Sequence, residues 1–349
     1  MNDRSLAWLQ IGRAAVAESV KRAVLEIFPD PVDALKADLS VLRHGKPCTY
    51  RRQALDSFVN RSGLQRDIDW LSMPTRSVIG LTDLLFPRLL REIANPPAIL
   101  YCEGEASFLS RPAVAVVGSR NPTPVGSESA SRFAGAIGGH GATVVSGLAL
   151  GIDSAAHRGA LGTRGSTIAV CATGLDTIYP RCHRKLACDI TDAGLMLSEF
   201  PPGVGVRRHH FPQRNRLISG LSLGTVVVEA GLGSGSLITA GFAADQGREV
   251  FAVPGSVNSP LSRGPHQLIR DGACLVETPV HVLESLSMLE VKEKPEQAPN
   301  NPPAWCAEIL GFVDFAPTPI NQIAEHSGLT MAKISAMLIR MEMQGLVKT

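Results

Sequence analysis

The most informative stretch of this chain runs from Phe211 to Gly255 and reads FPQRNRLISGLSLGTVVVEAGLGSGSLITAGFAADQGREVFAVPG. Within it, Thr225–Val228 is continuously apolar or β-branched and is followed by Glu229, a pattern typical of a parallel strand buried on both faces. The turn Gly231–Ser236 follows, and a helical pattern begins near Leu237. A glycine-rich turn at a helix start aims unpaired backbone N–H groups and the positive end of the helix dipole at one point. This segment therefore predicts a strand, a turn and a helix that together bind an anion, and we expect a phosphate.

Short apolar runs alternate with helical patterns on both sides of this unit, from Pro96 to Val276. Alternation at this spacing predicts an α/β fold with a doubly wound parallel sheet, in which ligands bind at the carboxyl ends of the strands. The expected strands are Ala113–Val117, Ala142–Val145, Ser166–Ala172, Leu195–Ser198, Thr225–Val228, Glu249–Val253 and Ala273–Val276.

The chain before the sheet has amphipathic patterns such as Leu6–Ile27 and Arg51–Ser62, separated by proline and aspartate. These predict a small helical domain over residues 1–85, of the SAM or helix-hairpin-helix kind, ahead of the sheet domain at 86–288.

The chain after the sheet begins with LEVKEKPEQAPNNPP, residues 289–303, whose charges and prolines predict a flexible linker. In residues 304–349, helical patterns at Ile320–Ser327 and Ala332–Gln344 are separated by Gly328 and followed by a short apolar run. A helix, a turn, a second helix and a closing strand predict a winged-helix domain.

Composition indicates the cellular compartment of the protein rather than its function. The chain has 349 residues, a net charge of only +2 and seven cysteines without paired spacing. We find no signal peptide and no apolar run long enough to span a membrane, so a cytoplasmic protein with free thiols is expected. Cys182, His183 and Cys188 resemble metal ligands, but no second pair completes a tetrahedral set, and no metal is expected.

Local charge is more informative than net charge. Between Pro201 and Gly220 lie four arginines, two histidines and no acid. A bare charge run is usually a solvated loop. Here it precedes the phosphate-type turn, and two further glycine loops, 118–120 and 146–153, follow neighbouring strands. Together they favour an extended anion groove, because a chain of several phosphates would use every loop whereas one nucleotide would use one.

Phe211 lies among these arginines. An aromatic ring interleaved with basic side chains is typical of proteins that hold single-stranded nucleic acid, where bases stack while the backbone follows positive charge. Guanidinium groups suit this role because they pair bidentately with phosphate. Simple core packing of the ring is the alternative.

Nucleotide cofactors and catalysis have weaker support. Neither GxGxxG with a distant acid nor GxxxxGK[ST] occurs, so no NAD and no P-loop nucleotide is expected as a cofactor. Asp153, His157 and Glu229 could assemble a hydrolase. However, Asp153 is also a natural cap for the helix that follows it, with His157 as its partner on that helix. We therefore expect no enzyme.

Six motifs in order closely resemble the DNA-processing protein DprA (Smf) family, across roughly Pro96 to Val276. This resemblance implies an extended Rossmann-like domain that dimerises and binds single-stranded DNA entering the cell during natural transformation. It also implies protection of that DNA and loading of the RecA recombinase. The motifs are GSRNPTPVG (118–126), VSGLALGIDSAAHRGAL (145–161), ATGLDTIYPRCHRKLA (172–187), SEFPPG (198–203), FPQRNRLISGLS (211–222) and EAGLGSGSLITA (229–240).

Carried onto this chain by motif, the resemblance implies a basic DNA pocket in which two glycines allow close backbone approach. The implied site residues are Gly118, Ser119, Arg120, Gly147, Gly151, Arg208, Phe211, Arg214, Asn215, Arg216, Ser234, Gly235, Ser236 and Thr239.

Two other functions remain open. Related Rossmann-like hydrolases of the lysine-decarboxylase-like group resemble PGGxGTxxE, with the acid after the turn, whereas no acid occurs here from Ala230 to Ala244. The second alternative function is a scaffold for RecA-like partners that touches DNA only incidentally.

The winged helix has three basic residues against four acids, so it could contact protein as well as DNA.

Overall fold

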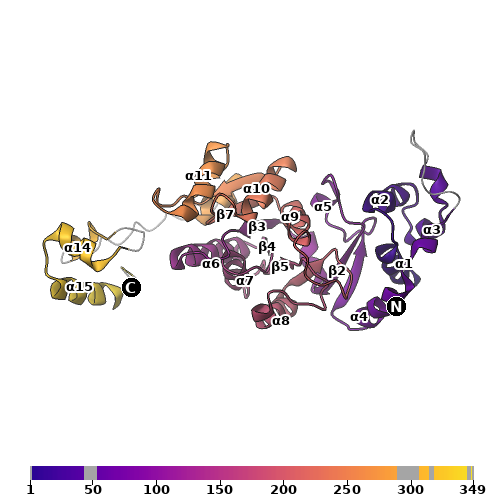
Figure 1. The fold of residues 1–349 in the computed structure, drawn as a ribbon, viewed down its shortest axis with the longest axis horizontal. Helices are drawn as coiled ribbons and strands as arrows, with labels where there is room; N and C mark the ends of the chain where they lie inside the picture. The colour runs from indigo at the N-terminus through magenta and orange to yellow at the C-terminus, as the bar shows by residue number, and fades with distance from the viewer. Residues whose placement is uncertain (1, 43–52, 289–305, 314–317, 344–346, 348–349) are drawn as a thin grey trace. The chain divides into compact units, whose positions relative to one another are not determined.

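The computed structural model describes residues 2–42, 53–288, 306–313, 318–343 and 347, within two compact units, residues 1–289 and 290–349 (Figure 1). The linker predicted at 289–303 lies outside the described residues. The first unit is built around a nine-stranded sheet with the order β1-β2-β6-β5-β4-β3-β7-β8-β9.

Seven of these strands are parallel and confirm the predicted doubly wound sheet. From β3 the chain adds β4, β5 and β6 on one side and then β7, β8 and β9 on the other. The strand order therefore reverses between β3 and β7, which is where open α/β sheets bind ligands. The parallel strands are β3 (Ala113–Val117), β4 (Thr143–Ser146), β5 (Thr167–Val170), β6 (Leu195–Ser198), β7 (Gly224–Val227), β8 (Glu249–Ala252) and β9 (Cys274–Leu275).

Two further strands, which the sequence did not predict, make the sheet mixed. β1 (Arg76–Gly80) and β2 (Ile99–Gly104) are antiparallel to each other, and β2 is antiparallel to β6. β1 lies inside the stretch expected to be helical, and it is a strand because β2 supplies its hydrogen-bonding partner. The domain boundary at residue 85 stays a prediction.

Two of the four N-terminal helices, α1 (Asp3–Arg13) and α4 (Arg61–Leu71), pack against these two strands. The other two are α2 (Glu18–Ile27) and α3 (Pro31–Lys36), so the pattern 6–27 divides into α1 and α2. In the pattern 51–62, the described part holds only a 3₁₀ turn at Leu55–Phe58 before α4 begins. The ring of Trp8 occupies the place where a Cβ on Gly80 would lie, 2.0 Å from the nearest ring atom, which fixes α1 against β1.

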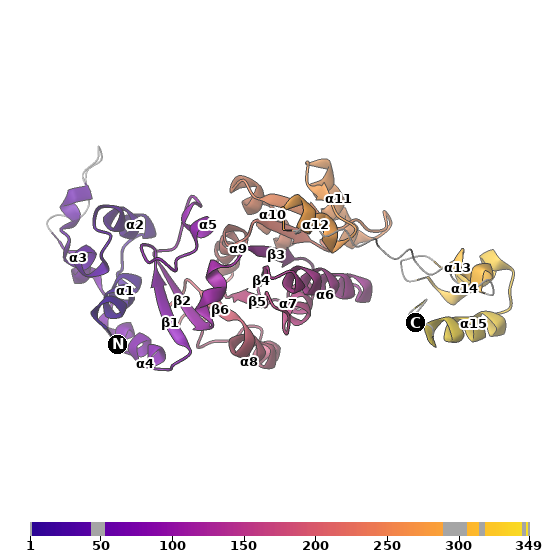
Figure 2. The same cartoon turned by 180° about the vertical axis from the view of Figure 1, so that it is seen from behind.

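Helices cover both faces of the parallel strands. Val114 and Val116 of β3 pack with α6 and α7, whereas Ala113 and Ala115 belong to the core that contains residues of α9 and α10. In both views α6 and α7 lie across the strands from α9 and α10 (Figures 1 and 2). The remaining helices of this unit are α5 (Arg88–Arg91), α6 (Pro124–Gly139), α7 (Ile152–Ala160), α8 (Arg184–Ala193), α9 (His210–Gly220), α10 (Gly235–Asp245), α11 (Arg263–Arg270) and α12 (Pro279–Ser285).

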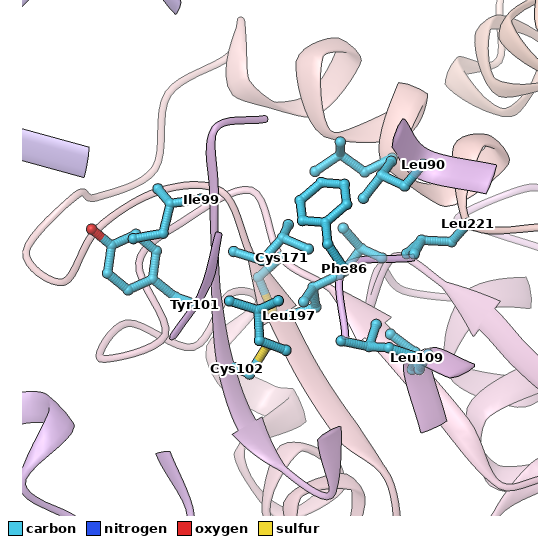
Figure 3. Packing of buried hydrophobic residues seen from close by; sticks show 14 of the residues in the cluster. Phe86, Leu90, Ile99, Tyr101, Cys102, Leu109, Cys171, Leu197 and Leu221 are labelled. Carbon is cyan, nitrogen blue, oxygen red and sulfur yellow. The ribbon is translucent and has the colours of Figure 1, made fainter. Parts of the chain in front are cut away.

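One continuous core joins the N-terminal elements to the sheet (Figure 3). Cys102 of β2 lies opposite Leu197 of β6 in the strand register, and Phe86 and Leu90 belong to the same cluster. Burial raises the pKa of the Cys102 thiol to about 12, so it acts as a small apolar side chain rather than a nucleophile.

The second unit contains α13 (Ala307–Leu310), α14 (Ile320–Ser327) and α15 (Met331–Met343). The two predicted helices are present, and Gly328 ends α14 with a left-handed φ of 67°. Buried side chains from all three helices, including Ile309, Ile323 and Ile334, form a small core. Almost all of the expected closing strand lies outside the described residues. The described parts of both units contain no helix that could span a membrane.

Candidate functional site

A pocket of about 850 Å³ opens where β3 and β7 end, at the reversal of strand order. Its walls come from the loop after β3, from α9 and its preceding connection, and from the turn that begins α10. Eleven of the fourteen residues predicted for the site line it, namely Gly118, Ser119, Arg120, Arg208, Phe211, Arg214, Asn215, Ser234, Gly235, Ser236 and Thr239.

The start of α10 forms one wall of the pocket. Ser234 caps this helix, since its hydroxyl accepts a hydrogen bond from the Ser236 backbone N–H at 3.3 Å and lies 2.7 Å from the Ser236 hydroxyl. The Asn215 amide of α9 donates to the Gly235 carbonyl at 3.3 Å, which ties the two helices together. The wall presents two hydroxyls and the positive end of an eleven-residue helix, a combination that suits a phosphate.

A second part of the lining combines a cation with two aromatic rings. The Arg120 guanidinium lies over the Phe211 ring, 5.5 Å from its centroid. The ring of Tyr179 meets Phe211 edge-on at 5.7 Å and is 46% exposed. Tyr179 was missed in the sequence because no basic residue precedes it in its loop, residues 171–178. Its place in the motif ATGLDTIYPRCHRKLA was the available signal.

Arg214 lines the pocket but serves mainly to hold the sheet edge together. Its guanidinium is buried and donates to the carbonyls of Gly147 and Val170, at the ends of β4 and β5. Burial lowers its pKa, and burial likewise raises the pKa of the neighbouring Asp153 carboxyl. With two donors engaged by backbone carbonyls, this side chain offers little to a mobile phosphate.

Gly147 and Gly151 do not line the pocket but allow its loops to pack. A Cβ on Gly147 would lie 2.7 Å from the Arg214 guanidinium. Gly151 has a φ of 78°, and a Cβ there would lie 2.3 Å from the Ser119 carbonyl oxygen. The close approach predicted for these glycines is therefore made within the protein, by the Arg214 side chain at Gly147 and by the loop that carries Arg120 at Gly151.

The structure does not bring Arg216 to the pocket. Its side chain forms an ion pair with the buried Glu199 and donates to the Asn95 carbonyl at 2.7 Å. Arg214 and Arg216 lie close in the sequence, but along a helix they point in different directions. A charge run in the sequence does not show which of its members faces the ligand.

His157 is held as a neutral structural residue. Its Nδ1–H donates to the Thr167 hydroxyl at 2.8 Å, because that hydroxyl donates to Val144, and its Nε2 accepts from the Leu148 N–H at 3.2 Å. Burial lowers its pKa to about 3. Asp153 accepts hydrogen bonds from the backbone N–H groups of Gly147 and Ala149. The two side chains therefore stabilise the β4–α7 loop and form no acid–base pair with each other.

Glu229 is also engaged structurally. Its carboxylate accepts hydrogen bonds from the Thr123 backbone N–H at 2.8 Å and from the Thr123 hydroxyl at 2.6 Å. Thr123 caps α6, and Gly126 leaves the room that the carboxylate fills. This carboxylate complements the positive end of α6 rather than projecting toward a substrate.

The cysteine and histidine cluster is divided by burial. His183 is buried and its Nδ1–H donates to the Leu148 carbonyl at 2.9 Å, whereas Cys182 and Cys188 are exposed. Within the described residues, no group of three His, Cys, Asp or Glu side chains is placed to hold a metal ion.

Family models match both units of the chain. A model described as DNA recombination-mediator protein A matches residues 77–287, and one described as the DprA winged helix domain matches residues 293–349. Protein Smf of Escherichia coli (strain K12) is 39% identical over 293 residues, which cover 82% of this chain and 78% of that protein. DNA processing protein DprA of Streptococcus pneumoniae is 45% identical over 204 residues, covering 58% of this chain and 72% of that protein.

Solved structures agree with this relationship. The X-ray structure of DNA processing protein A from Streptococcus pneumoniae superposes with a TM-score of 0.70 at 35% identity, covering 81% of this chain and 98% of that chain. The structure of DNA processing protein A from Helicobacter pylori gives a TM-score of 0.56 at 31% identity, covering 61% and 95%. This chain therefore belongs to the DNA recombination-mediator protein A family, the family of DNA-processing proteins that includes DprA and Smf.

Proposed function

We propose that this protein binds single-stranded DNA without catalysing a reaction on it, and that the pocket between β3 and β7 is the binding site. The observation that carries the proposal is the Arg120 guanidinium over the Phe211 ring, in the same pocket as the capped start of α10. The ring offers a surface on which a base stacks, while the cation and the helix start attract phosphates.

The charge of the pocket supports a polyanion. Its lining includes the exposed cations Arg120 and Arg208, and its one carboxylate, Asp153, is buried against the β4–α7 loop. The half-buried Phe211 ring beside the exposed cations Arg120 and Arg208 suits a strand whose bases are unpaired, because bases stacked inside a duplex cannot reach the ring.

The relatives support the same function. The Helicobacter pylori structure is described by its single-stranded DNA binding mode, and the matching family is described as a recombination mediator. We extend the proposal accordingly. In the cytoplasm the protein protects incoming single strands during natural transformation and helps load RecA on them, and it acts as a homodimer through the sheet-containing unit.

The proposal that the protein is not an enzyme is supported by two engaged side chains. Glu229 binds Thr123, and His157 is neutral and bonded at both ring nitrogens. A hydrolase assembled from Glu229 or His157 would need that side chain to reach a substrate. Turnover of any nucleoside monophosphate by the purified protein would support the hydrolase alternative instead.

Fluorescence anisotropy of a labelled oligo-dT, titrated with protein across a salt series, tests the binding proposal. We expect affinity to fall with salt by about 0.7 logarithmic units for each contacted phosphate, per logarithmic unit of salt. A duplex of the same length should compete poorly. Absence of binding at low salt, or equal competition by duplex, would overturn the proposal.

RecA loading needs a separate assay. The protein should accelerate assembly of RecA filaments on single strands already coated with single-strand-binding protein, with light scattering giving its oligomeric state. Unchanged assembly with intact DNA binding would remove the mediator role and leave the binding role standing.

A further inference from the structure

We propose that Arg13 and Asp67, on the N-terminal helices α1 and α4, are positioning residues for the pocket. They fix the β6–α9 connection, residues 199–209, so that Arg208 is held where it meets a bound strand. This connection supplies Val206 and Arg208 to the pocket lining. The inference rests on the proposed single-strand binding and gives a part in it to two helices of which no residue lines the pocket.

The part of this connection that reaches the pocket is weakly held by itself. Gly205 and Val206 are exposed and make no hydrogen bond to any residue that the structure describes. On the α9 side, turn hydrogen bonds hold the carbonyls of Arg207 and Arg208. The course of the chain between β6 and this turn therefore depends on contacts made at Pro202–Val204.

The Arg13 guanidinium provides one of these contacts. It forms a two-bond ion pair with Asp67, in which Nε donates at 2.7 Å and Nη2 at 2.5 Å. Nη2 also donates to the Pro202 carbonyl at 2.7 Å. The Asp67 side chain is fully buried and that of Arg13 is 13% exposed, so water competes little for these bonds. The ion pair alone would join α1 to α4, whereas the bond to Pro202 extends the pair to the connection.

Two glycines make room for this contact. Gly63 lies in the first turn of α4, where alanine has the higher helix propensity, and a Cβ there would lie 2.6 Å from the Arg13 guanidinium. Gly203 follows Pro202 with a φ of 87°, and a Cβ on it would collide with the Arg66 guanidinium of α4. Local preference is given up at both positions in favour of close packing between α4 and the connection.

The connection between β5 and α8 holds the same point from another element. Both carboxylate oxygens of Asp176 accept the Gly203 N–H, at 2.9 and 2.8 Å. The Gly174 N–H donates to the Val204 carbonyl at 2.9 Å. Three consecutive residues are thus fixed, Pro202 by the N-terminal helices and the next two by this second connection.

Arg76 and Glu103 form a matched ion pair away from the pocket. The Arg76 Nε donates to Glu103 at 2.9 Å, and its Nη1 donates to the Trp70 backbone carbonyl at 3.3 Å. The two side chains are 23% and 17% exposed. This pair joins β1 to β2 and α4 but touches no residue of the pocket lining.

Oligo-dT anisotropy across a salt series, with the full-length protein, tests the positioning role. The variant Arg13→Met, Asp67→Leu replaces the pair with apolar side chains, so net charge is unchanged and no unpaired charge is buried. The control Arg76→Met, Glu103→Leu makes the same change at the matched pair. Each variant is also combined with Arg208→Gln, and urea unfolding is measured for all of them.

We expect Arg13→Met, Asp67→Leu to bind oligo-dT about fivefold more weakly than wild type. Its salt slope should fall by about 0.7, the value for one phosphate contact. Adding Arg208→Gln to this variant should leave its binding equal to that of Arg208→Gln alone, because both changes remove the same contact. The control should bind like wild type and should show the full effect of Arg208→Gln.

Gly63→Ala decides the question if the double variant does not fold. It displaces the Arg13 guanidinium and leaves every charge in place, so we expect the same fall in salt slope. Gly139→Ala is its control, because a Cβ at that position on α6 would meet no atom within 4 Å.

Wild-type binding by the Arg13 and Asp67 variant, or by Gly63→Ala where the former is unfolded, would overturn the positioning role. A loss that adds fully to that of Arg208→Gln would overturn it as well. Absence of binding by wild type would instead overturn the proposed function itself, so the two failures are distinguishable.

Discussion

The guanidinium of Arg120 lies 5.5 Å from the centroid of the Phe211 ring. The two residues come from the loop after β3 and from the first turn of α9, which are distant in the sequence. Their contact forms a single rim at the reversal of strand order, where a cation and a stacking surface are held together before any ligand arrives. Preformed geometry of this kind lowers the entropic cost of ordering the site on binding.

Phe211→Leu should weaken oligo-dT binding by about 1–3 kcal/mol, because a stacking surface is lost while the charge is kept. The salt slope of this variant should stay that of wild type.

Arg120→Gln should instead lower the salt slope of oligo-dT binding by about 0.7. Arg111→Gln is the matched control, since Arg111 lies over Phe108 at 4.4 Å outside the pocket lining. An effect of Arg111→Gln equal to that of Arg120→Gln would contradict the site.

Arg216→Met should destabilise folding by up to about 3–5 kcal/mol above pH 7, where the Glu199 carboxyl would be ionised and buried without its partner. Urea unfolding measures this change. The double variant Arg216→Met, Glu199→Leu should recover much of the loss, since no buried charge remains. Arg88→Met, at an ion pair with a 91% exposed arginine, should change stability by less than about 1 kcal/mol. A lower salt slope in folded Arg216→Met would show that this arginine contacts DNA after all.

Glu199 should also make stability depend on pH. Burial raises the pKa of its carboxyl from 4.5 to about 7, even beside Arg216. The pKa of this carboxyl is higher in the folded state than in the unfolded state. Its contribution to folding stability is therefore fully present below pH 4.5 and is lost as the pH rises through 7. The stability of Glu199→Gln relative to wild type should therefore increase as the pH rises from 5 to 8, as measured by urea midpoints. A constant difference across that range would contradict the raised pKa.

Gly151→Ala should be much more destabilising than Gly162→Ala. The two glycines have similar φ values, 78° and 81°. A Cβ on Gly151 would lie 2.3 Å from the Ser119 carbonyl, whereas a Cβ on Gly162 would meet no atom within 4 Å. Gly162→Ala should cost about 1–3 kcal/mol from backbone strain alone. Equal thermal shifts would show that the close approach beneath Ser119 relaxes freely.

His157 should remain neutral across the physiological range. Burial lowers its pKa to about 3, and both ring nitrogens have partners within the fold. Nitrogen NMR of the labelled protein should show one tautomer, protonated at Nδ1, with no titration between pH 8 and pH 5. A midpoint near pH 6.5 would indicate that the ring is accessible to solvent and would reopen a catalytic role.

The parallel sheet and most of the pocket could be predicted because their signals are local. Continuous apolar runs such as Val114–Val117 and the glycine turn at Gly231–Ser236 indicate buried strands and a helix start within a few residues. β1 could not be predicted in this way, since Arg76–Gly80 is a strand only through pairing with β2.

The direction of each arginine in the run 207–216 also required the structure. Arg208 faces the pocket, Arg214 is buried against carbonyl oxygens, and Arg216 binds Glu199 on another side of α9. Residue type alone did not distinguish these three environments. Tyr179 shows the converse, because an isolated aromatic residue gives no sign of binding until the fold brings it to Phe211.

Photocrosslinking of a 5-iodouracil-substituted oligo-dT, followed by mass spectrometry, identifies the residues that lie against the bases. We expect crosslinks at Phe211 and Tyr179, lost on competition with unlabelled oligo-dT and retained in the presence of duplex. Crosslinks confined to residues outside the pocket, with none at these two rings, would contradict the assignment of this pocket as the single-strand binding site.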